Sequence, residues 1–498
     1  MSTATPAPGT RPGGPGRPRT LRRRTAAALA SAAVTLSLVA AAVPGPRALG
    51  VGDRLFPALG NPGYDVRAYH LAFRYGGDHD RPLRARTRIT ARVTADRLER
   101  VNLDFSGGEV RSARIAGRDV RHTTVGEDLV LTPDRPLRRG ALLRVDIRHT
   151  SPTDGSRGGW VRTRDGLVMA NQADAAHRVF PCNDHPSDKA RFTFRLTAPR
   201  GVTAVANGVR TGARHTKART TWTYTSRHPM ATELAQVSLG RSDVVRAAGP
   251  HGLPLRHVVP SRHRAGLEPW LARTPGQLRW LERRLGRYPF ETYGLLVADA
   301  RTGFALETQT LSLFERRLFA GDSFPDWYRE SVMVHELAHQ WFGNSVAPRR
   351  WADLWLNEGH ATWYEWHYAE HRGGTPVAER MRRAYARSDE WRERYGPPAD
   401  PRPLRPGDRT GLFRKSVYDG SALVLYALRE EVGTRDFRRL QRAWTARHRD
   451  GVAGTRDFVR LAEEVSGRDL DAFFRGWLHG ERTPPMPGHP QWRTRKSG

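Results

Sequence analysis

The most informative segment of this 498-residue sequence is Val334-His335-Glu336-Leu337-Ala338-His339-Gln340. It lies within a helical pattern that predicts a helix over residues 328–343. Because His335 and His339 are four residues apart, both imidazoles project from one helix face and can bind the same ion at about 2.0–2.1 Å. Glu336 would lie beside that ion, where it can take a proton from water at the metal. The segment therefore predicts a zinc site.

A catalytic zinc ion needs a third protein ligand and one open position. The run Trp351-Ala352-Asp353-Leu354-Trp355-Leu356-Asn357-Glu358-Gly359 supplies that ligand as Glu358, with eighteen residues between it and His339. This spacing leaves room for a loop and for a second helix, over 354–371, that returns past the metal. A structural zinc site would add another His or Cys, so we predict one catalytic Zn²⁺ held by His335, His339 and Glu358. For Asp353 two interpretations stay open, a carboxylate that supports the site and a solvated acid at a helix start.

The hydrophobic pattern divides the rest of the chain into a strand-rich and a helical part. Period-two alternation, typical of half-buried strands, runs from about residue 55 to 245 and predicts an antiparallel β-domain over 51–248. From residue 249 to 480 the pattern predicts a mostly helical catalytic domain, and a basic, Pro-rich tail follows at 481–498. The fold class expected is α+β multidomain. The helices expected besides 328–343 and 354–371 are 267–286, 377–394, 418–432 and 454–479.

The N-terminal segment, residues 1–45, has the pattern of a secretory signal. Six arginines and no acids precede an apolar stretch from Ala26 to Val43, which contains the small residues Ala40-Ala41-Ala42. We expect a secreted protein, exported by a Sec or a twin-arginine route. A membrane-anchored form is the alternative if the signal is not cleaved. No later stretch is apolar enough for a stable membrane span.

Composition narrows the possible functions. A single cysteine, Cys182, excludes an intrachain disulfide and a cysteine-built zinc finger, and we interpret it as a buried apolar residue. The 82 Lys+Arg against 51 Asp+Glu give a net charge of +31. The arginines are spread along the chain without an RNA- or DNA-binding motif, so we expect no specific nucleic-acid partner. Weak, salt-sensitive adhesion to polyanionic surfaces is expected instead.

Four segments resemble the M1 family of zinc aminopeptidases (gluzincins). The zinc helix with its downstream Leu354-to-Gly359 run is the most specific, and the other three segments support it. These three are Gly303-Phe304-Ala305-Leu306-Glu307-Thr308-Gln309, similar to GAMEN; Val179-Phe180-Pro181-Cys182-Asn183-Asp184-His185-Pro186, similar to FPCxDEP; and Val417-Tyr418-Asp419-Gly420-Ser421-Ala422, similar to YxxGA. The resemblance implies an N-terminal β-saddle domain, then a thermolysin-like catalytic domain, in a short form without the family's long C-terminal helical domain.

The resemblance also assigns roles to residues outside the zinc motif. Glu307 would lie on an edge strand over the metal and pair with the free α-ammonium of a peptide. Tyr418 would donate its phenol to the developing oxyanion. Gln172 lies in the region that contributes to the pocket for the first side chain. Without the motifs, Glu307 would be interpreted as an exposed strand acid and Tyr418 as a core tyrosine.

Some positions depart from the family pattern. His360 stands where Phe often follows, and we interpret it as a surface histidine near the site. His185 replaces an acid, and Leu306 and Thr308 change the pocket wall, so substrate preference does not follow. The function predicted is hydrolysis of N-terminal residues from peptides with a free N-terminus. The alternatives are a thermolysin-type endopeptidase, an epoxide hydrolase related to M1, and a non-enzymatic zinc-bearing scaffold.

Overall fold

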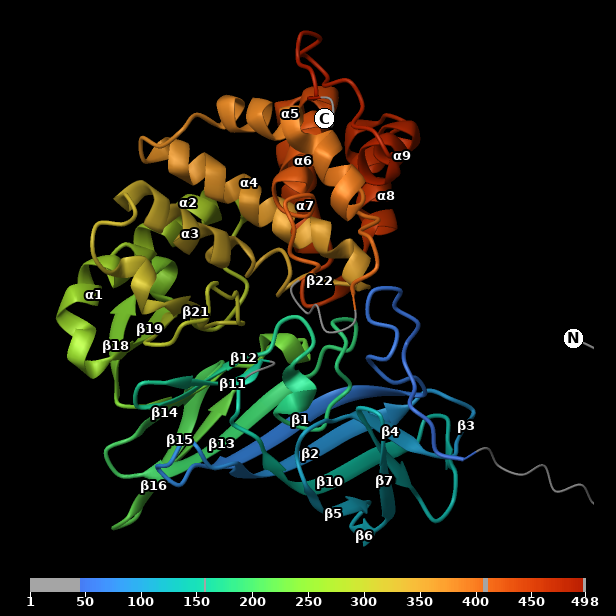
Figure 1. Cartoon of the computed structure of the whole chain (residues 1–498), viewed down its shortest axis with the longest axis vertical. Helices are drawn as coiled ribbons and strands as arrows, with labels where there is room; N and C mark the ends of the chain where they lie inside the picture. The colour runs from blue at the N-terminus through green and yellow to red at the C-terminus, as the bar shows by residue number, and fades with distance from the viewer. Residues whose placement is uncertain (1–44, 156–157, 406–410, 496–498) are drawn as a thin grey trace, which may run out of the picture. The chain divides into compact units, whose positions relative to one another are not determined.

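In the computed structural model, an eight-stranded sheet forms the largest part of the strand-rich region (Figure 1). Its apolar residues alternate as predicted: Ile89 pairs directly with Val145, and both side chains are buried. Pairing is antiparallel except between β1 and β13, which run parallel. The strands, in spatial order, are β15 (Val209–His215), β16 (Arg219–Thr225), β13 (Arg191–Pro199), β1 (Tyr64–Arg74), β2 (Leu83–Val93), β10 (Leu142–Ser151), β5 (Val110–Ile115) and β6 (Arg118–Asp119).

Smaller sheets connect this layer to the helical region. One contains β11 (Gly159–Thr163), β12 (Gly166–Ala170), β17 (Val237–Gly240) and β14 (Thr203–Ala206). Another contains β18 (Ser242–Ala248), β19 (Pro254–Pro260), β20 (Leu295–Ala298) and β21 (Ser312–Glu315). The remaining strands are β3 (Arg97–Leu98) with β9 (Leu137–Arg138), β4 (Val101–Asp104) with β8 (Asp128–Thr132) and β7 (Arg121–Val125), and β22 (Ala347–Pro348) with β23 (Val452–Ala453).

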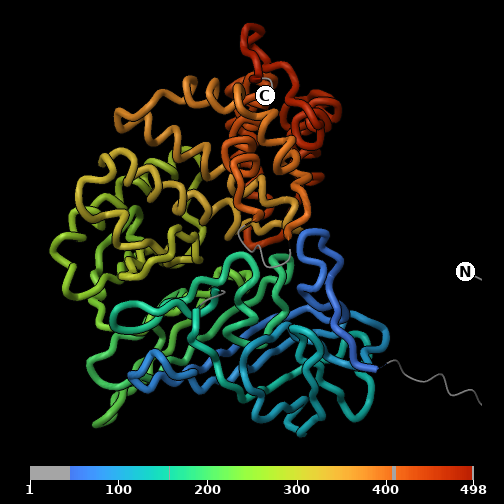
Figure 2. The backbone as a smooth tube through the Cα atoms, viewed as in Figure 1, coloured from blue at the N-terminus to red at the C-terminus, as the bar shows by residue number. Residues whose placement is uncertain are grey.

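The structure describes residues 45–155, 158–405 and 411–495. The predicted signal segment therefore lies outside the described residues, apart from Gly45. Residues from Pro46 onward cluster as one compact unit, in which the strands up to β17 and the helices occupy separate regions of the backbone trace, while β18 and β19 lie with the helices (Figure 1 and Figure 2). Among the described residues, no helix has both the length and the apolar character needed to cross a bilayer.

The helical region follows the predicted order with three differences. The helix expected over 267–286 is two helices, because Pro275 begins a new one and the chain turns just before it. The segment 454–479 is also divided, since Gly467 adopts a left-handed conformation (φ 68°) that ends the first helix. The pattern at 434–447 was missed. The helices are α1 (Arg264–Leu271), α2 (Thr274–Leu285), α3 (Asp326–Ala338), α4 (Trp355–His371), α5 (Val377–Tyr395), α6 (Asp419–Val432), α7 (Thr434–Arg447), α8 (Thr455–Ser466) and α9 (Asp471–His479).

Two packing contacts place the zinc motif. Helices α3 and α4 pack against each other, and α4 packs against α6 (Figure 1). From the strand-rich region, the buried Lys189 ammonium donates to the carbonyl oxygens of Asn344 and Ser345, each at 2.8 Å, just after α3. The loop that follows the zinc helix is therefore fixed by both regions.

Candidate metal centre

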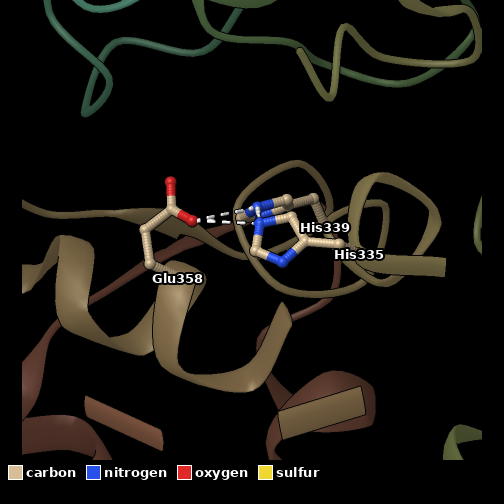
Figure 3. A group of neighbouring side chains, drawn as sticks. All are labelled: His335, His339 and Glu358. Atoms are coloured by element: carbon tan, nitrogen blue, oxygen red, sulfur yellow. Dashed lines mark hydrogen bonds and ion pairs between the residues drawn. The ribbon is translucent and has the colours of Figure 1, made fainter. Parts of the chain in front are cut away.

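Three side chains from two helices converge on one point (Figure 3). His335 comes from α3, His339 caps the end of that helix with helical dihedrals, and Glu358 comes from the first turn of α4. Their ligand atoms lie within 4.8 Å of one another and all three residues are buried. The structure therefore brings together the three ligands predicted from the sequence.

The triangle formed by these atoms fits a zinc ion. Glu358 Oε2 lies 3.3 Å from His335 Nε2 and 3.4 Å from His339 Nε2, and the two nitrogens are 3.2 Å apart. Tetrahedral ligands at about 2.0–2.1 Å from an ion are separated by about 3.3–3.4 Å. Two imidazole nitrogens and one carboxylate oxygen are also a usual donor set for catalytic zinc.

The electrostatics of the triad suit a dication. Burial opposes charge on His335, but hydrogen bonds to Glu358 and Glu365 raise its pKa well above the ordinary value. Burial likewise opposes charge on His339, whereas Glu307 and Glu358 raise its pKa to about 9. For Glu358 itself, burial disfavours ionisation, but the two histidines lower its pKa to about 2. The carboxylates thus create a negative potential that stabilises positive charge at this point.

The second nitrogen of each imidazole has its own partner. His335 Nδ1 lies 2.9 Å from Glu365 Oε2, and His339 Nδ1 lies 3.1 Å from the carbonyl oxygen of Phe342. When Nδ1–H donates to these oxygens, Nε2 keeps its lone pair for the metal. Sequence reasoning missed Glu365. It is seven residues after Glu358 in α4, hence on the same helix face, and that spacing is the signal that could have found it.

Glu336 and Tyr418 face a cavity beside the triad. The cavity has a volume of about 360 Å³ and is also lined by His335. Tyr418 directly precedes α6, and its ring centroid lies 5.9 Å from that of His335. Burial and then Glu358 raise the pKa of the Tyr418 phenol well above its usual value, so it remains a proton donor. Glu336 is buried, and burial raises the pKa of its carboxyl.

Glu307 and Gln172 meet next to the metal ligands. Gln172 Nε2 donates to Glu307 Oε1 at 2.6 Å, and that oxygen lies 4.0 Å from His339 Nδ1. Side-chain amides of Gln340 and Asn344 donate to the backbone oxygen of Glu307, at 2.9 and 2.6 Å. Glu307 is only 5% exposed, so it is not an exposed strand acid.

The position of Glu307 differs in one respect from the expectation. It does not lie in a strand; the preceding residue, Leu306, makes a single bridge to Leu313 of β21. At this point the Glu307 carbonyl accepts hydrogen bonds from the side-chain amides of Gln340 and Asn344, which follow α3. Because that carbonyl is not paired with a neighbouring strand, the sheet pairing ends there. Gln340 and Asn344 are thus site residues whose role the sequence did not reveal.

The interpretation of His360 as a surface residue is wrong. The ring is fully buried and stacks on Phe342 with centroids 4.0 Å apart, while its Nδ1 lies 2.7 Å from the carbonyl oxygen of Leu356. Burial lowers the pKa of His360 to about 3, so the ring is neutral. It occupies a flat apolar slot, which explains why an aromatic ring can replace it.

His185, Asp353 and Cys182 have structural surroundings. His185 Nε2 lies 3.2 Å from Asp53 Oδ2, and the same oxygen accepts the backbone N–H of Trp351. Asp353 is buried and accepts hydrogen bonds from both the N–H and the hydroxyl of Thr455 at the start of α8. Its carboxylate therefore neither supports a metal ligand nor faces solvent, and both interpretations of it are wrong. Cys182 is fully buried, as predicted.

Known proteins share this arrangement. Residues 271–477 match the peptidase family M1 domain, and residues 163–234 match the peptidase M1 N-terminal domain. An M1 zinc metallopeptidase from Deinococcus radiodurans is 30% identical, with a TM-score of 0.72 over 88% of this chain and 98% of that one. The chain belongs to peptidase family M1. Both the predicted family and the predicted order, a β-rich domain followed by a helical one, are confirmed.

Two further M1 relatives bear on the site. A mutant of the Deinococcus radiodurans enzyme bound to a Tyr-Ser-Ala substrate is 29% identical, with a TM-score of 0.74 over 89% of this chain and all of that one. Leucyl aminopeptidase of Saccharolobus solfataricus is 24% identical over 357 residues, which are 67% of this M1 chain and 43% of that protein. The chain therefore spans less than half the length of this curated relative. Zinc is the metal of the M1 metallopeptidases, and the triad described above fits it.

Proposed function

We propose that this protein is a zinc aminopeptidase that removes N-terminal residues from peptides with a free N-terminus. The observation that carries the proposal is the buried Glu307 carboxylate beside the metal ligand His339. In the described part of the chain, no lysine or arginine forms an ion pair with Glu307, so its charge is available for an ammonium group. A fixed anion at this point selects the first residue of a peptide and is of no use to an endopeptidase.

Each site residue has a distinct task in peptide hydrolysis. Zinc held by His335, His339 and Glu358 supplies Lewis-acid polarisation of the scissile carbonyl and the attacking water. Glu336 accepts the proton of that water and passes it to the leaving amine.

Glu307 and Tyr418 act on the substrate directly. Glu307, oriented by the amide of Gln172, binds the α-ammonium and so sets which bond is cut. Tyr418 donates its phenol to the carbonyl oxygen as negative charge develops there.

The experiment compares aminoacyl-naphthylamides with their N-acetylated forms, with and without a chelator. We expect cleavage of the free amines only, lost with chelator and restored by zinc. The Tyr-Ser-Ala tripeptide bound by the relative is a suitable peptide substrate for the same comparison. Cleavage of blocked peptides at internal bonds would assign the protein to the endopeptidases, and hydrolysis of an epoxide without peptide hydrolysis would assign it to the epoxide hydrolases. A protein that binds zinc but cleaves none of these would be the scaffold.

We propose, in addition, that the protein is exported. The support is the basic, then apolar, then small-residue pattern of residues 1–45. N-terminal sequencing of the protein recovered from the culture medium tests this. A mature chain beginning shortly after Ala42 is expected, whereas an intact N-terminus in the cell membrane would indicate the anchored form.

Weak adhesion to polyanions is a further part of the proposal. On the eight-stranded sheet, Arg148 pairs in register with Arg86, and both Arg86 and Arg195 pair with Ala72. This places three guanidinium groups in one row, along a groove of the sheet surface in which Asp146 is the acid neighbour. Retention on a polyphosphate resin should fall with salt and should be weaker for Arg148→Gln. Retention equal to that of the wild type would place any adhesion elsewhere.

A further inference from the structure

A second cavity is lined by residues of helices α2, α4, α6 and α7, and none of the metal ligands of α3 and α4 is among them. With 3.6 residues per turn, Glu358 and Glu365 share one face of α4, whereas His367 lies on the opposite face and Tyr364 about 120° round the helix from Glu358. The cavity has a volume of about 480 Å³, within the range of small-molecule sites. None of its lining residues belongs to the metal centre.

The rim of this cavity is built from arginines of three helices. They are Arg283 and Arg284 of α2, Arg429 of α6, and Arg438, Arg439 and Arg442 of α7. Among the residues that the structure describes, no carboxylate lines the cavity. Glu430 pairs with Arg429 and Asp436 with Arg439, both from outside it.

The remaining rim arginines have no acidic partner among the described residues. Arg284 and Arg442 donate to backbone carbonyl oxygens, and within the described ranges no acid lies within ion-pair distance of Arg283 or Arg438. Burial lowers the pKa of Arg284; Tyr364 opposes this change, and the like charges of Arg283 and Arg438 add to it. The rim therefore carries uncompensated positive charge.

The floor is aromatic and contains an unused hydrogen-bond donor. Trp363 and Tyr364 of α4 and Phe437 of α7 provide flat apolar surface. Gln441 is only 3% exposed, and its Oε1 accepts the hydroxyl of Tyr364 at 3.0 Å. That bond fixes the amide, yet its Nε2 is buried without any acceptor. A buried donor without a partner destabilises the folded chain, and a ligand acceptor that reached Nε2 would remove this cost.

We propose that this cavity is a second binding site, for an organic anion that joins a phosphate-type oxyanion to a flat apolar group. Guanidinium groups bind such oxyanions through two parallel hydrogen bonds, and several of them match more than one negative charge. The Gln441 amide adds a neutral donor at the floor, and the aromatic side chains cover the apolar part of the ligand. A purely apolar ligand would not compensate the positive charge of the rim. An inorganic ion alone would leave the aromatic side chains of the floor exposed to water.

Phenyl phosphate is the probe, titrated into the zinc-loaded full-length protein and followed by ligand-detected NMR. We expect saturable binding, weaker binding of inorganic phosphate and no binding of phenol. Arg438→Gln, at an exposed position, should weaken the affinity about tenfold. The control is Arg456→Gln, which makes the same charge change at an exposed position away from the cavity and should leave the affinity unchanged.

Gln441→Glu tests the floor without removing the acceptor for Tyr364. Its carboxylate would offset part of the rim charge and repel the phosphate, so the variant should bind phenyl phosphate more weakly while its thermal midpoint rises. Glu307→Gln separates this cavity from the metal centre and should bind phenyl phosphate normally. The proposal is overturned if binding is not saturable, if Arg438→Gln binds as tightly as the wild type, if inorganic phosphate binds equally well, or if Glu307→Gln abolishes binding.

Discussion

At the scale of single residues, the metal centre depends on one carboxylate oxygen. Glu358 Oε2 lies close to both imidazole nitrogens, 3.3 Å from His335 Nε2 and 3.4 Å from His339 Nε2. Such close groups from two different helices are stabilised only if a positive charge lies between them or a proton is shared among them. The neighbouring residues then form two groups: those that orient the metal ligands, and so hold this geometry, and those that act on the substrate or the attacking water, and so use it.

Glu336 belongs to the residues that use it. Glu336→Gln keeps the size of the side chain and removes the base, so turnover should fall about 10²–10⁴-fold. Zinc content should stay at that of the wild type because Glu336 is not one of the three ligands. Activity on an aminoacyl-naphthylamide and metal analysis of the same preparation check this. A variant with near-normal turnover would contradict the assignment of Glu336 as the base.

Glu365 belongs to the residues that hold the geometry. Glu365→Gln weakens the acceptor for His335 Nδ1, so zinc affinity should fall about 10–100-fold. Competition with a chelator measures the affinity, and excess zinc should restore most of the activity. Glu390→Gln, an exposed change of the same kind on α5, should alter neither quantity. Unchanged zinc affinity would mean that Glu365 does not orient His335.

At the scale of helices, Gly359 sets how closely α4 approaches α6. A Cβ atom on Gly359 would lie 2.8 Å from the Cβ of Ser421 and 3.2 Å from its carbonyl carbon. The residue next to the ligand Glu358 therefore has no room for a side chain. This gives a physical reason for glycine after Glu358 in the predicted motif.

Gly359→Ala should consequently separate the two helices and displace Glu358. Overpacking costs about 1–3 kcal/mol and better helix propensity returns up to about 1, so a net loss of about 1–2 kcal/mol is expected. Urea unfolding measures the loss, and a chelator titration should show weaker zinc binding. Gly266→Ala in α1, where nothing lies within 4 Å, is the control and should not destabilise the protein. Ser421→Gly should partly rescue Gly359→Ala, and no rescue would rule out the steric explanation.

The sequence predicted the parts of the fold and site that depend on local spacing. The four-residue separation of His335 and His339 and the alternation around Ile89 follow from helix and strand geometry alone. The sequence did not predict burial that depends on the surroundings of a whole element. Helix α4 is buried nearly all round, so its polar residues give no amphipathic pattern, and His360 was placed on the surface.

The same reason explains the missed site residues. Gln340 and Asn344 act through amide hydrogen bonds to the backbone of Glu307, more than thirty residues away in sequence. A contact of this kind leaves no periodic pattern in the sequence. Helix breaks at Pro275 and Gly467 have clear local causes, by contrast, and could have been predicted from the residue types.

At the scale of the whole molecule, a buried charged cluster fixes the strand-rich region beneath the site. His177 is fully buried, with its Nδ1 2.7 Å from Asp184 Oδ2. Asp184 also accepts the hydroxyl of Thr232, and its N–H donates to Asp104 Oδ2 at 2.7 Å. These residues join the end of β4, the segment before β13 and the segment before β17, so their charge state should affect the stability of the folded chain.

This cluster should make the protein less stable as the pH rises from 6.5 to about 8. Burial opposes charge on His177, but Asp184 and Glu127 raise its pKa from 6.5 to about 9. A raised histidine pKa contributes stability that is complete below 6.5 and is lost as the pH rises through about 9. Burial and then Asp184 raise the pKa of Asp104 to about 8, which acts in the same direction. Above about 8 the buried Lys189, whose pKa burial lowers to about 8, acts in the opposite direction.

The contribution of His177 is isolated by comparison with His177→Gln, which keeps a donor for Asp184 but cannot be protonated. The difference in unfolding free energy between wild type and variant should shrink by about 1–2 kcal/mol from pH 6.5 to about 8. Urea unfolding at fixed zinc concentration measures it, because the pH dependence of zinc binding is common to both proteins and cancels. His122→Gln, at an exposed position on β7, should differ from the wild type by the same amount at both pH values. A His177 difference that is constant or grows with pH would show that this imidazole is neutral in the folded protein.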